Sequence, residues 1–110
     1  MYKIIDFSDF KKIKLKVGKV LTAENIKGSN KLLKLSVDVG EPSPRILVAG
    51  LANIYKPEEL IGKKIIVVTN MKPAKIFGVE SNGMLLAAVN KDQVAVLTVD
   101  SDIEAGSEAE

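Results

Sequence analysis

The sequence predicts an all-β domain in which about six short antiparallel strands close into a small barrel. Three observations lead to this prediction. Apolar and polar side chains alternate over several short stretches, connections rich in glycine and proline separate these stretches, and little of the chain has helical periodicity. The chain has 110 residues, of which 46% are apolar and 27% charged. This length and composition suit one domain with one core.

The chain begins with a short expected helix, which is followed by a strand with lysines on its outer face. The helix is expected over residues 6–11, where Phe7 and Phe10 fall on one face. From residue 13 to residue 17, apolar side chains alternate with lysines, which predicts a half-buried strand. The alternation changes phase at Gly18, and a glycine at such a position indicates a β-bulge that lets a small barrel curve.

Alternation or short apolar runs predict five further strands. The clearest is residues 32–39, in which four apolar side chains face one way. The others are expected at residues 45–49, 63–69, 83–89 and 94–99. A brief helix is expected from Pro57 to Leu60, because proline is favoured in the first helical turn. The acidic stretch 101–110 is either a short edge strand or a mobile tail.

The absence of cysteine and histidine excludes several kinds of catalytic and metal-binding site. Without cysteine the sequence has no disulfide, thiolate zinc site or cysteine nucleophile, and without histidine it lacks the commonest general base and metal ligand. A phosphate-binding P-loop is also missing, since Lys64 stands where serine or threonine is required. We therefore expect no catalytic residues, no metal site and no cofactor. Neither a bilayer-spanning apolar run nor a signal peptide is recognisable, so a soluble cytoplasmic protein is expected.

Basic and acidic residues are unevenly distributed along the chain. Residues 1–90 contain fifteen basic and eight acidic side chains, a net charge of +7, whereas residues 91–110 contain one lysine and six acidic side chains, a net charge of −5. A basic body with an acidic end indicates a surface that binds a polyanion. The alternative is a solvated lysine surface of the kind found on thermophilic proteins.

The most informative segment is residues 70–86. Pro73 is expected to begin a single helical turn that Gly78 ends. On such a turn Lys72 and Lys75 are three residues apart, so their side chains would project together.

The end of this segment is expected to form a tight polar turn. Ser81, Asn82 and Gly83 would present backbone amides and an exposed hydroxyl group, which are suited to hold a phosphate or a ribose. The strand that follows begins at Met84, whose flexible thioether is suited to lie against a base.

This segment closely resembles the corresponding motif of the tRNA-binding domain family. The resemblance extends from about residue 7 to residue 106 and includes further blocks at residues 15–20, 37–41, 44–51 and 55–62. The family includes the domain appended to many methionyl-tRNA synthetases, stand-alone tRNA-binding proteins of similar length and a related domain of multisynthetase-complex factors. The chain departs from the family pattern in the loop 27–30, where the family often has a His-Pro pair, and in its unusually acidic end.

The resemblance implies one tRNA-binding domain over residues 1–110, with the OB fold, a five-stranded Greek-key barrel with a short N-terminal helix and a C-terminal β extension. The barrel would span about residues 12–90, and the extension, about residues 91–107, would pair two copies into a homodimer. The implied function is non-catalytic binding of structured tRNA through its shape and backbone, alone or as an accessory β subunit of methionyl-tRNA synthetase. The implied RNA-binding residues are Lys31, Arg45, Asn70, Lys72, Lys75, Ser81, Asn82 and Met84.

For several of these residues the sequence alone is also compatible with a structural role instead of RNA binding. Arg45 is able to pair with Asp38 or Glu41 instead of a phosphate. Asn70 is able to cap a strand end, and Met84 to fill the core, while the two lysines near Pro73 are consistent with an ordinary solvated surface.

The fold that the resemblance implies is compatible with two other functions. A related dimeric family of secretion chaperones binds unfolded polypeptide, but its motif has Asn-Phe-Pro-Pro and lacks the Ser-x-Gly-Met turn. Residues 72–75 and 81–84 of this chain therefore favour RNA. OB proteins that bind single strands stack bases on several aromatic rings. Only five aromatic residues are present here, so folded RNA fits better than a single strand.

Overall fold

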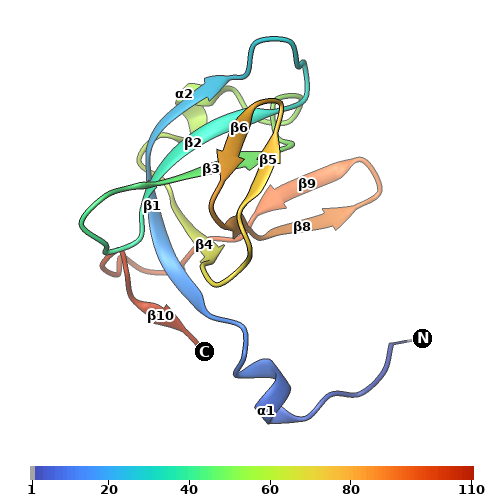
Figure 1. The fold of residues 1–110 in the computed structure, drawn as a ribbon, viewed down its shortest axis with the longest axis vertical. Helices are drawn as coiled ribbons and strands as arrows, with labels where there is room; N and C mark the ends of the chain where they lie inside the picture. Colours follow the sequence, from blue (N-terminus) through green and yellow to red (C-terminus); the bar gives the residue numbers. More distant parts are fainter. Residues whose placement is uncertain (1) are drawn as a thin grey trace.

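Strands dominate the structure and surround a single apolar core (Figure 1). The computed structural model describes residues 2–110. Two short helices are present, α1 (Phe7–Phe10) and α2 (Pro57–Leu60). The longer strands are β1 (Leu15–Asn25), β2 (Leu33–Asp38), β3 (Arg45–Ala49) and β4 (Lys64–Val68). The shorter ones are β5 (Ala74–Ile76), β6 (Val79–Ser81), β7 (Met84–Leu85), β8 (Ala87–Asn90), β9 (Gln93–Val96) and β10 (Glu108–Ala109).

Five strands form the wall of the barrel. They are hydrogen-bonded in the order β3-β2-β1-β4-β7, and every neighbouring pair is antiparallel. The two ends of this path meet where the Asn82 amide donates a hydrogen bond of 2.8 Å to the Ile46 carbonyl in β3. The predicted all-β class and five-stranded OB barrel are confirmed.

The core lies inside this wall, and alternate residues of β2 contribute to it together with residues of β1, β3 and β4. Leu33, Leu35 and Val37 have no exposed surface, and Leu47 from β3 and Ile65 from β4 pack against them. The alternation predicted for residues 32–39 is therefore confirmed. Burying each of these side chains contributes roughly 1.5–3 kcal/mol, so this cluster is the main source of the domain's stability.

Gly18 has a different role from the one that the sequence suggested. β1 runs through this residue in regular register with β4, and the register shift with β2 lies between Val20 and Thr22. The bulge is therefore present in β1, but its predicted position was wrong. Gly18 is buried, and a Cβ atom there would lie 2.6 Å from Cγ1 of Val37. The phase change marks a point where the barrel interior has no room for a side chain.

The two helices are confirmed where the sequence predicted them. α1 lies outside the barrel (Figure 1), and its Phe7 and Phe10 rings stack with centroids 6.4 Å apart. α2 packs against β1 and contributes the fully buried Leu60 to the core. Both are a single turn long, and no helix among residues 2–110 is long and apolar enough to cross a membrane.

The helical turn predicted after Pro73 was wrong, because this segment forms a β-hairpin. β5 and β6 pair with each other, and Phe77 and Gly78 form the two-residue turn between them. Both turn residues have positive φ, 49° for Phe77 and 78° for Gly78. Two-residue turns with positive φ at both positions fit the right-handed twist of a β-hairpin. Lys75 is therefore on a strand, opposite Glu80, and the proposed helical spacing to Lys72 does not exist.

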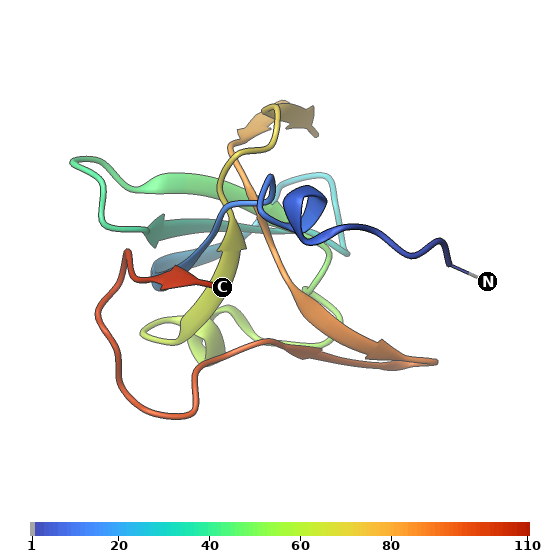
Figure 2. The ribbon, with the colours of Figure 1, turned by 90° about the horizontal axis from the view of Figure 1, so that it is seen from below.

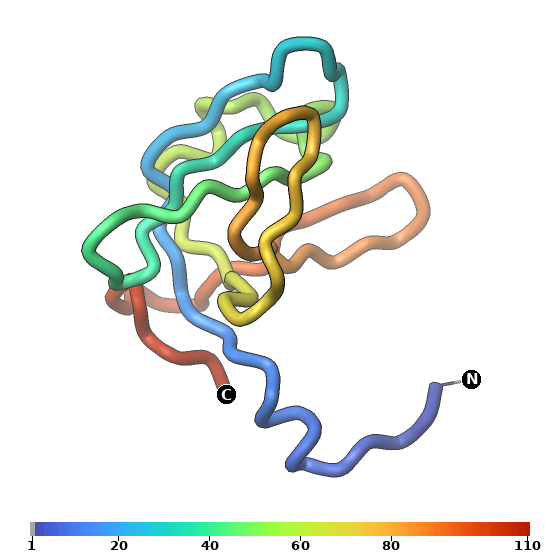
Figure 3. Tube along the Cα trace, in the orientation of Figure 1, coloured from blue at the N-terminus to red at the C-terminus, as the bar shows by residue number. Residues whose placement is uncertain are grey.

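The C-terminal part of the chain first leaves the barrel and then returns to it. β8 and β9 pair only with each other and form a hairpin that projects from the body (Figure 2). The Val96 amide ties this hairpin to the barrel by donating to the Tyr55 hydroxyl at 3.1 Å. The last residues then lie beside β1, and β10 pairs with Leu15 and Lys16 (Figure 3). Of the two alternatives for residues 101–110, the structure has the edge strand.

Candidate nucleic-acid interface

Arg45 joins three segments at one end of the barrel. Its Nε and Nη2 each donate a hydrogen bond of 2.8 Å to the Glu41 carboxylate. Its Nη1 donates to the carbonyls of Thr69, at 2.7 Å, and Asn82, at 3.3 Å. The pairing with Glu41 is one of the alternatives that the sequence left open. Because the Arg45 side chain is only 15% exposed and four of its five N–H donors are engaged, a phosphate contact from this residue stays a prediction.

The ion pair between Arg45 and Glu41 also favours the ionised form of Glu41. The hydrogen bonds from Arg45 hold the pKa of the Glu41 carboxyl below its ordinary value, and the positive charges of Arg45 and Lys16 act in the same direction. Partial desolvation opposes this effect. Glu41 is therefore ionised at neutral pH, and it neutralises the only arginine of the chain.

Asn70 fastens the segment before β1 to the end of β4. Its Oδ1 accepts the Lys14 amide at 2.9 Å, and its Nδ2 donates to the Lys12 carbonyl at 2.6 Å. The side chain is exposed and keeps one further lone pair and one further proton. The structure thus shows a strand-end role, and an additional contact with RNA stays a prediction.

Ser81 does not present an exposed hydroxyl group, so this expectation was wrong. The residue is 5% exposed. Its Oγ accepts the Val48 amide at 3.0 Å and donates to the Gly83 carbonyl at 3.1 Å. These bonds tie the base of the β5–β6 hairpin to β3. The hydroxyl proton is already used, so Ser81 positions the loop that follows it.

The residues on either side of Gly83 are accessible. Asn82 is half-buried, and its side chain makes no hydrogen bond within residues 2–110. Met84 pairs with Val68 of β4, yet its side chain is 43% exposed. The alternative in which Met84 fills the core is therefore wrong.

The two hairpin lysines are free to meet an anion. Lys72 and Lys75 are exposed, and within residues 2–110 neither ammonium group has a carboxylate within 4.0 Å. Four of the predicted residues in or beside this hairpin are therefore accessible, and we refer to them together as the hairpin surface: Lys72, Lys75, Asn82 and Met84.

Strand register places Lys31 relative to this hairpin. Ser81 bonds to Val48, whereas Asn82 bonds to Ile46, so β6 runs antiparallel to β3. The hairpin tip therefore points toward the end of β3, where Ala49 pairs with Leu33. The exposed Lys31 lies in the β1–β2 loop at that same end (Figure 3). Lys31 is thus beyond the tip, and the other predicted residues lie along the hairpin and at its base.

Arg45 and Asn70 also open onto a separate groove between α1 and the barrel. This groove has a volume of about 630 Å³. It is lined by three lysines that are not among the RNA-binding residues predicted from the sequence, Lys11, Lys14 and Lys16. The alternation of lysines along the first strand is a signal for Lys14 and Lys16, whereas Lys11 lies at the end of α1. The groove also contains three acidic residues, Glu41, Glu108 and Glu110, so its charge is partly neutralised.

Comparison with known proteins identifies the family. The family model described as "Putative tRNA binding domain" matches residues 15–108. The chain is 55% identical over 105 residues to the methionine–tRNA ligase of Methanosarcina mazei, an alignment that covers 94% of this chain and 15% of the ligase. The chain thus spans about one sixth of the length of the ligases that it matches.

Two solved structures share the whole fold. A protein from Pyrococcus horikoshii described as related to methionyl-tRNA synthetase superposes with a TM-score of 0.92 at 43% identity, covering 99% of this chain and 100% of that one. The CsaA chaperone protein of Picrophilus torridus superposes with a TM-score of 0.88 at 34% identity, covering 97% and 100%. Sequence and structure agree with the motif at residues 70–86, and the chain belongs to the tRNA-binding domain family.

Proposed function

We propose that this chain binds tRNA without catalysing a reaction, and that it does so through the hairpin surface. The observation that supports the proposal most strongly is the pair of exposed lysines, on and just before a hairpin that packs against β3 of an OB barrel, that make no ion pair within 4.0 Å among residues 2–110. Exposed lysine ammonium groups suit phosphates, and the accessible side chains of Asn82 and Met84 suit a ribose or a base edge. Recognition of this kind reads the backbone and shape of a folded RNA.

The aromatic residues favour folded RNA over a single strand. Phe7 and Phe10 stack on each other outside the barrel, and the Tyr55 hydroxyl accepts a hydrogen bond from β9. A row of exposed rings along β2 and β3, which single-strand binding by OB folds uses, is absent from the described residues.

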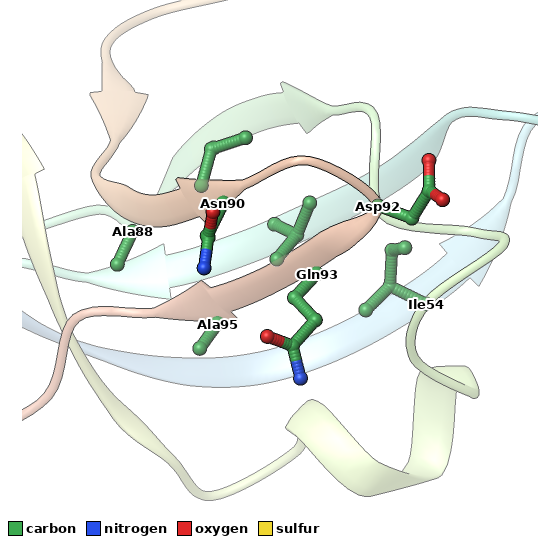
Figure 4. Close-up of a pocket in the computed structure, with 8 residues that line it drawn as sticks. Ile54, Ala88, Asn90, Asp92, Gln93 and Ala95 are labelled. Carbon is green, nitrogen blue, oxygen red and sulfur yellow. The ribbon is translucent and has the colours of Figure 1, made fainter.

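We also propose that the domain acts as a homodimer. The β8–β9 hairpin pairs with no other strand of residues 2–110, and it borders a pocket of about 470 Å³ lined largely by apolar side chains (Figure 4). Val89 in this pocket is 69% exposed and Ile54 is 41% exposed. A second copy that packs on this hairpin would bury both side chains, and two-fold pairing is the commonest closed symmetry.

The relatives support a proposal for the cellular role. The matched region is a small part of the methionine–tRNA ligases, so their ligase activity is not assigned to this chain. We propose that the domain works in the cytoplasm, alone or as an accessory subunit that helps a methionyl-tRNA synthetase to hold tRNA. The CsaA neighbours suggest binding of unfolded polypeptide as the alternative.

A comparison of two double variants tests the hairpin surface. Lys72→Ala with Lys75→Ala removes two charges there, and Lys11→Ala with Lys14→Ala removes two charges from the groove. We expect the first variant to bind tRNA about 30-fold more weakly, about 1 kcal/mol for each lysine, and the second to change less. The slope of log affinity against log salt should decrease by about 0.7–0.9 per lost contact in the first variant.

Competition then distinguishes the ligand classes. Intact tRNA should displace labelled tRNA far better than poly(U) of equal length, and an unfolded polypeptide should not displace it. Unchanged tRNA affinity of a folded Lys72/Lys75 variant would refute the proposed surface. Preferential binding of the unfolded polypeptide would replace tRNA binding with the chaperone function.

A further inference from the structure

Phe77 occupies a position in the chain where a large aromatic residue is unfavourable. It is the first of the two turn residues at the tip of the β5–β6 hairpin, with a φ of 49°. Tight turns with positive φ at both central residues strongly favour asparagine or aspartate followed by glycine. Gly78 meets this preference, with a φ of 78°. Phenylalanine does not, because a bulky side chain in the left-handed region is strained.

The ring lies mostly outside the protein and does not join the core that residues 2–110 form. Phe77 is 62% exposed, and it is absent from the hydrophobic core. It also stacks on no other aromatic ring among residues 2–110. Neither turn preference nor burial therefore accounts for this residue. Residues with a strained backbone cluster at functional sites.

The surroundings of the ring indicate its ligand. Lys75, two residues before Phe77, is exposed and unneutralised, and Lys72 lies at the base of the same hairpin. Lys31 is in the loop at the end toward which the tip points. An exposed apolar ring on a hairpin that also carries exposed lysines suits an unpaired base, whose face stacks on the ring while its phosphates meet the ammonium groups.

We infer that Phe77 is a stacking contact for one unpaired base in a loop of the bound RNA. This inference rests on the proposed tRNA binding and adds a single-stranded element to recognition of the backbone. A lone ring at a hairpin tip accepts one splayed base, whereas a continuous strand requires several rings. The domain would then distinguish folded RNA with exposed loop bases from a fully paired duplex.

Two substitutions test the inference. Phe77→Asn removes the ring and inserts a residue that the turn prefers, so the hairpin should remain intact. We expect this variant to bind tRNA about tenfold more weakly and to bind a fully paired RNA duplex as the unchanged protein does. Phe77→Trp restores a ring and should keep the tRNA affinity within about threefold.

Phe77→Trp also gives a direct optical signal, because the sequence contains no tryptophan. Stacking of a base on the indole should quench its emission when tRNA saturates the protein, and should protect it from acrylamide. The duplex should do neither. An unchanged emission at saturation, or unchanged tRNA affinity of Phe77→Asn, would overturn the inference. If the Lys72/Lys75 variant still loses affinity, the proposed function stands; if the unchanged protein does not bind tRNA, both fail.

Discussion

Replacing Ser81 with alanine separates a structural role of its hydroxyl group from a contact with RNA. The change removes the hydrogen bond that Oγ accepts from the Val48 amide and the one that it donates to the Gly83 carbonyl. The Val48 amide then has no protein acceptor. An unsatisfied buried donor costs about 1–3 kcal/mol. Because Val48 is half-buried and water is able to reach it, we expect the free energy of unfolding to decrease by about 1–2 kcal/mol.

Urea unfolding at one protein concentration measures this decrease. With an m-value of about 1–2 kcal/mol per molar urea, the midpoint of Ser81→Ala should fall by roughly 1 M while the slope is unchanged. Asn82→Ala is the matched control, because the neighbouring side chain makes no hydrogen bond within residues 2–110. Its free energy of unfolding should stay within about 0.5 kcal/mol of that of the unchanged protein.

Binding of tRNA by the same two variants completes the comparison. Under conditions in which Ser81→Ala is fully folded, we expect it to keep most of its affinity, whereas Asn82→Ala should bind more weakly. The opposite pattern would refute the reasoning. If Ser81→Ala unfolds at the urea concentration of the unchanged protein and loses tenfold in affinity, its hydroxyl group contacts RNA directly.

Three further predictions follow from the same geometry. Met84→Ala should weaken tRNA binding with little change in Tm, because the side chain is 43% exposed; a drop of several degrees in Tm would show that it supports the core. The lowered pKa of Glu41 stabilises the fold above its ordinary pKa of 4.5, and this stabilisation is lost as the pH falls through the lower pKa of the folded state. Glu41→Gln should therefore lose less stability between pH 7 and pH 3 than the unchanged protein does, as urea titrations would show. Deleting residues 94–110 should give a monomer or an insoluble chain, and sedimentation of the full chain as a monomer at micromolar concentration would contradict the homodimer.

The fold was predictable where periodicity extends over a whole strand. In residues 32–39 four alternate apolar side chains identify both the strand and its buried face, and the structure buries all of them. The segment after Pro73 is different, because β5 and β6 have three residues each and are too short to show a period. Proline and two lysines three residues apart predicted a helix. The usual sequence signal of such a hairpin turn is asparagine or aspartate before glycine, and phenylalanine stands at that position here.

The sequence predicted which lysines of the candidate site are exposed, but it did not predict the structural roles of Ser81 and Arg45. The exposure of Lys72 and Lys75 agrees with a surface that meets an anion. The sequence carries no sign that Ser81 is buried, since its partner Val48 is far away in the chain and only the closure of the barrel brings them together. The same is true of Arg45, which reaches the carbonyls of Thr69 and Asn82 from another strand.

The pairing of β10 with β1 affects the order in which this domain can fold. The first half of β1 lies between β4 on one side and β10 on the other, and Leu15 pairs with Ala109. Closing a loop of nearly the whole chain is entropically costly and slow, so this contact should form last. Until it forms, amide and carbonyl groups along one side of β1 are open to pairing with another chain. The domain should therefore be most prone to aggregate while it is being synthesised or refolded, and well protected once its last few residues are in place.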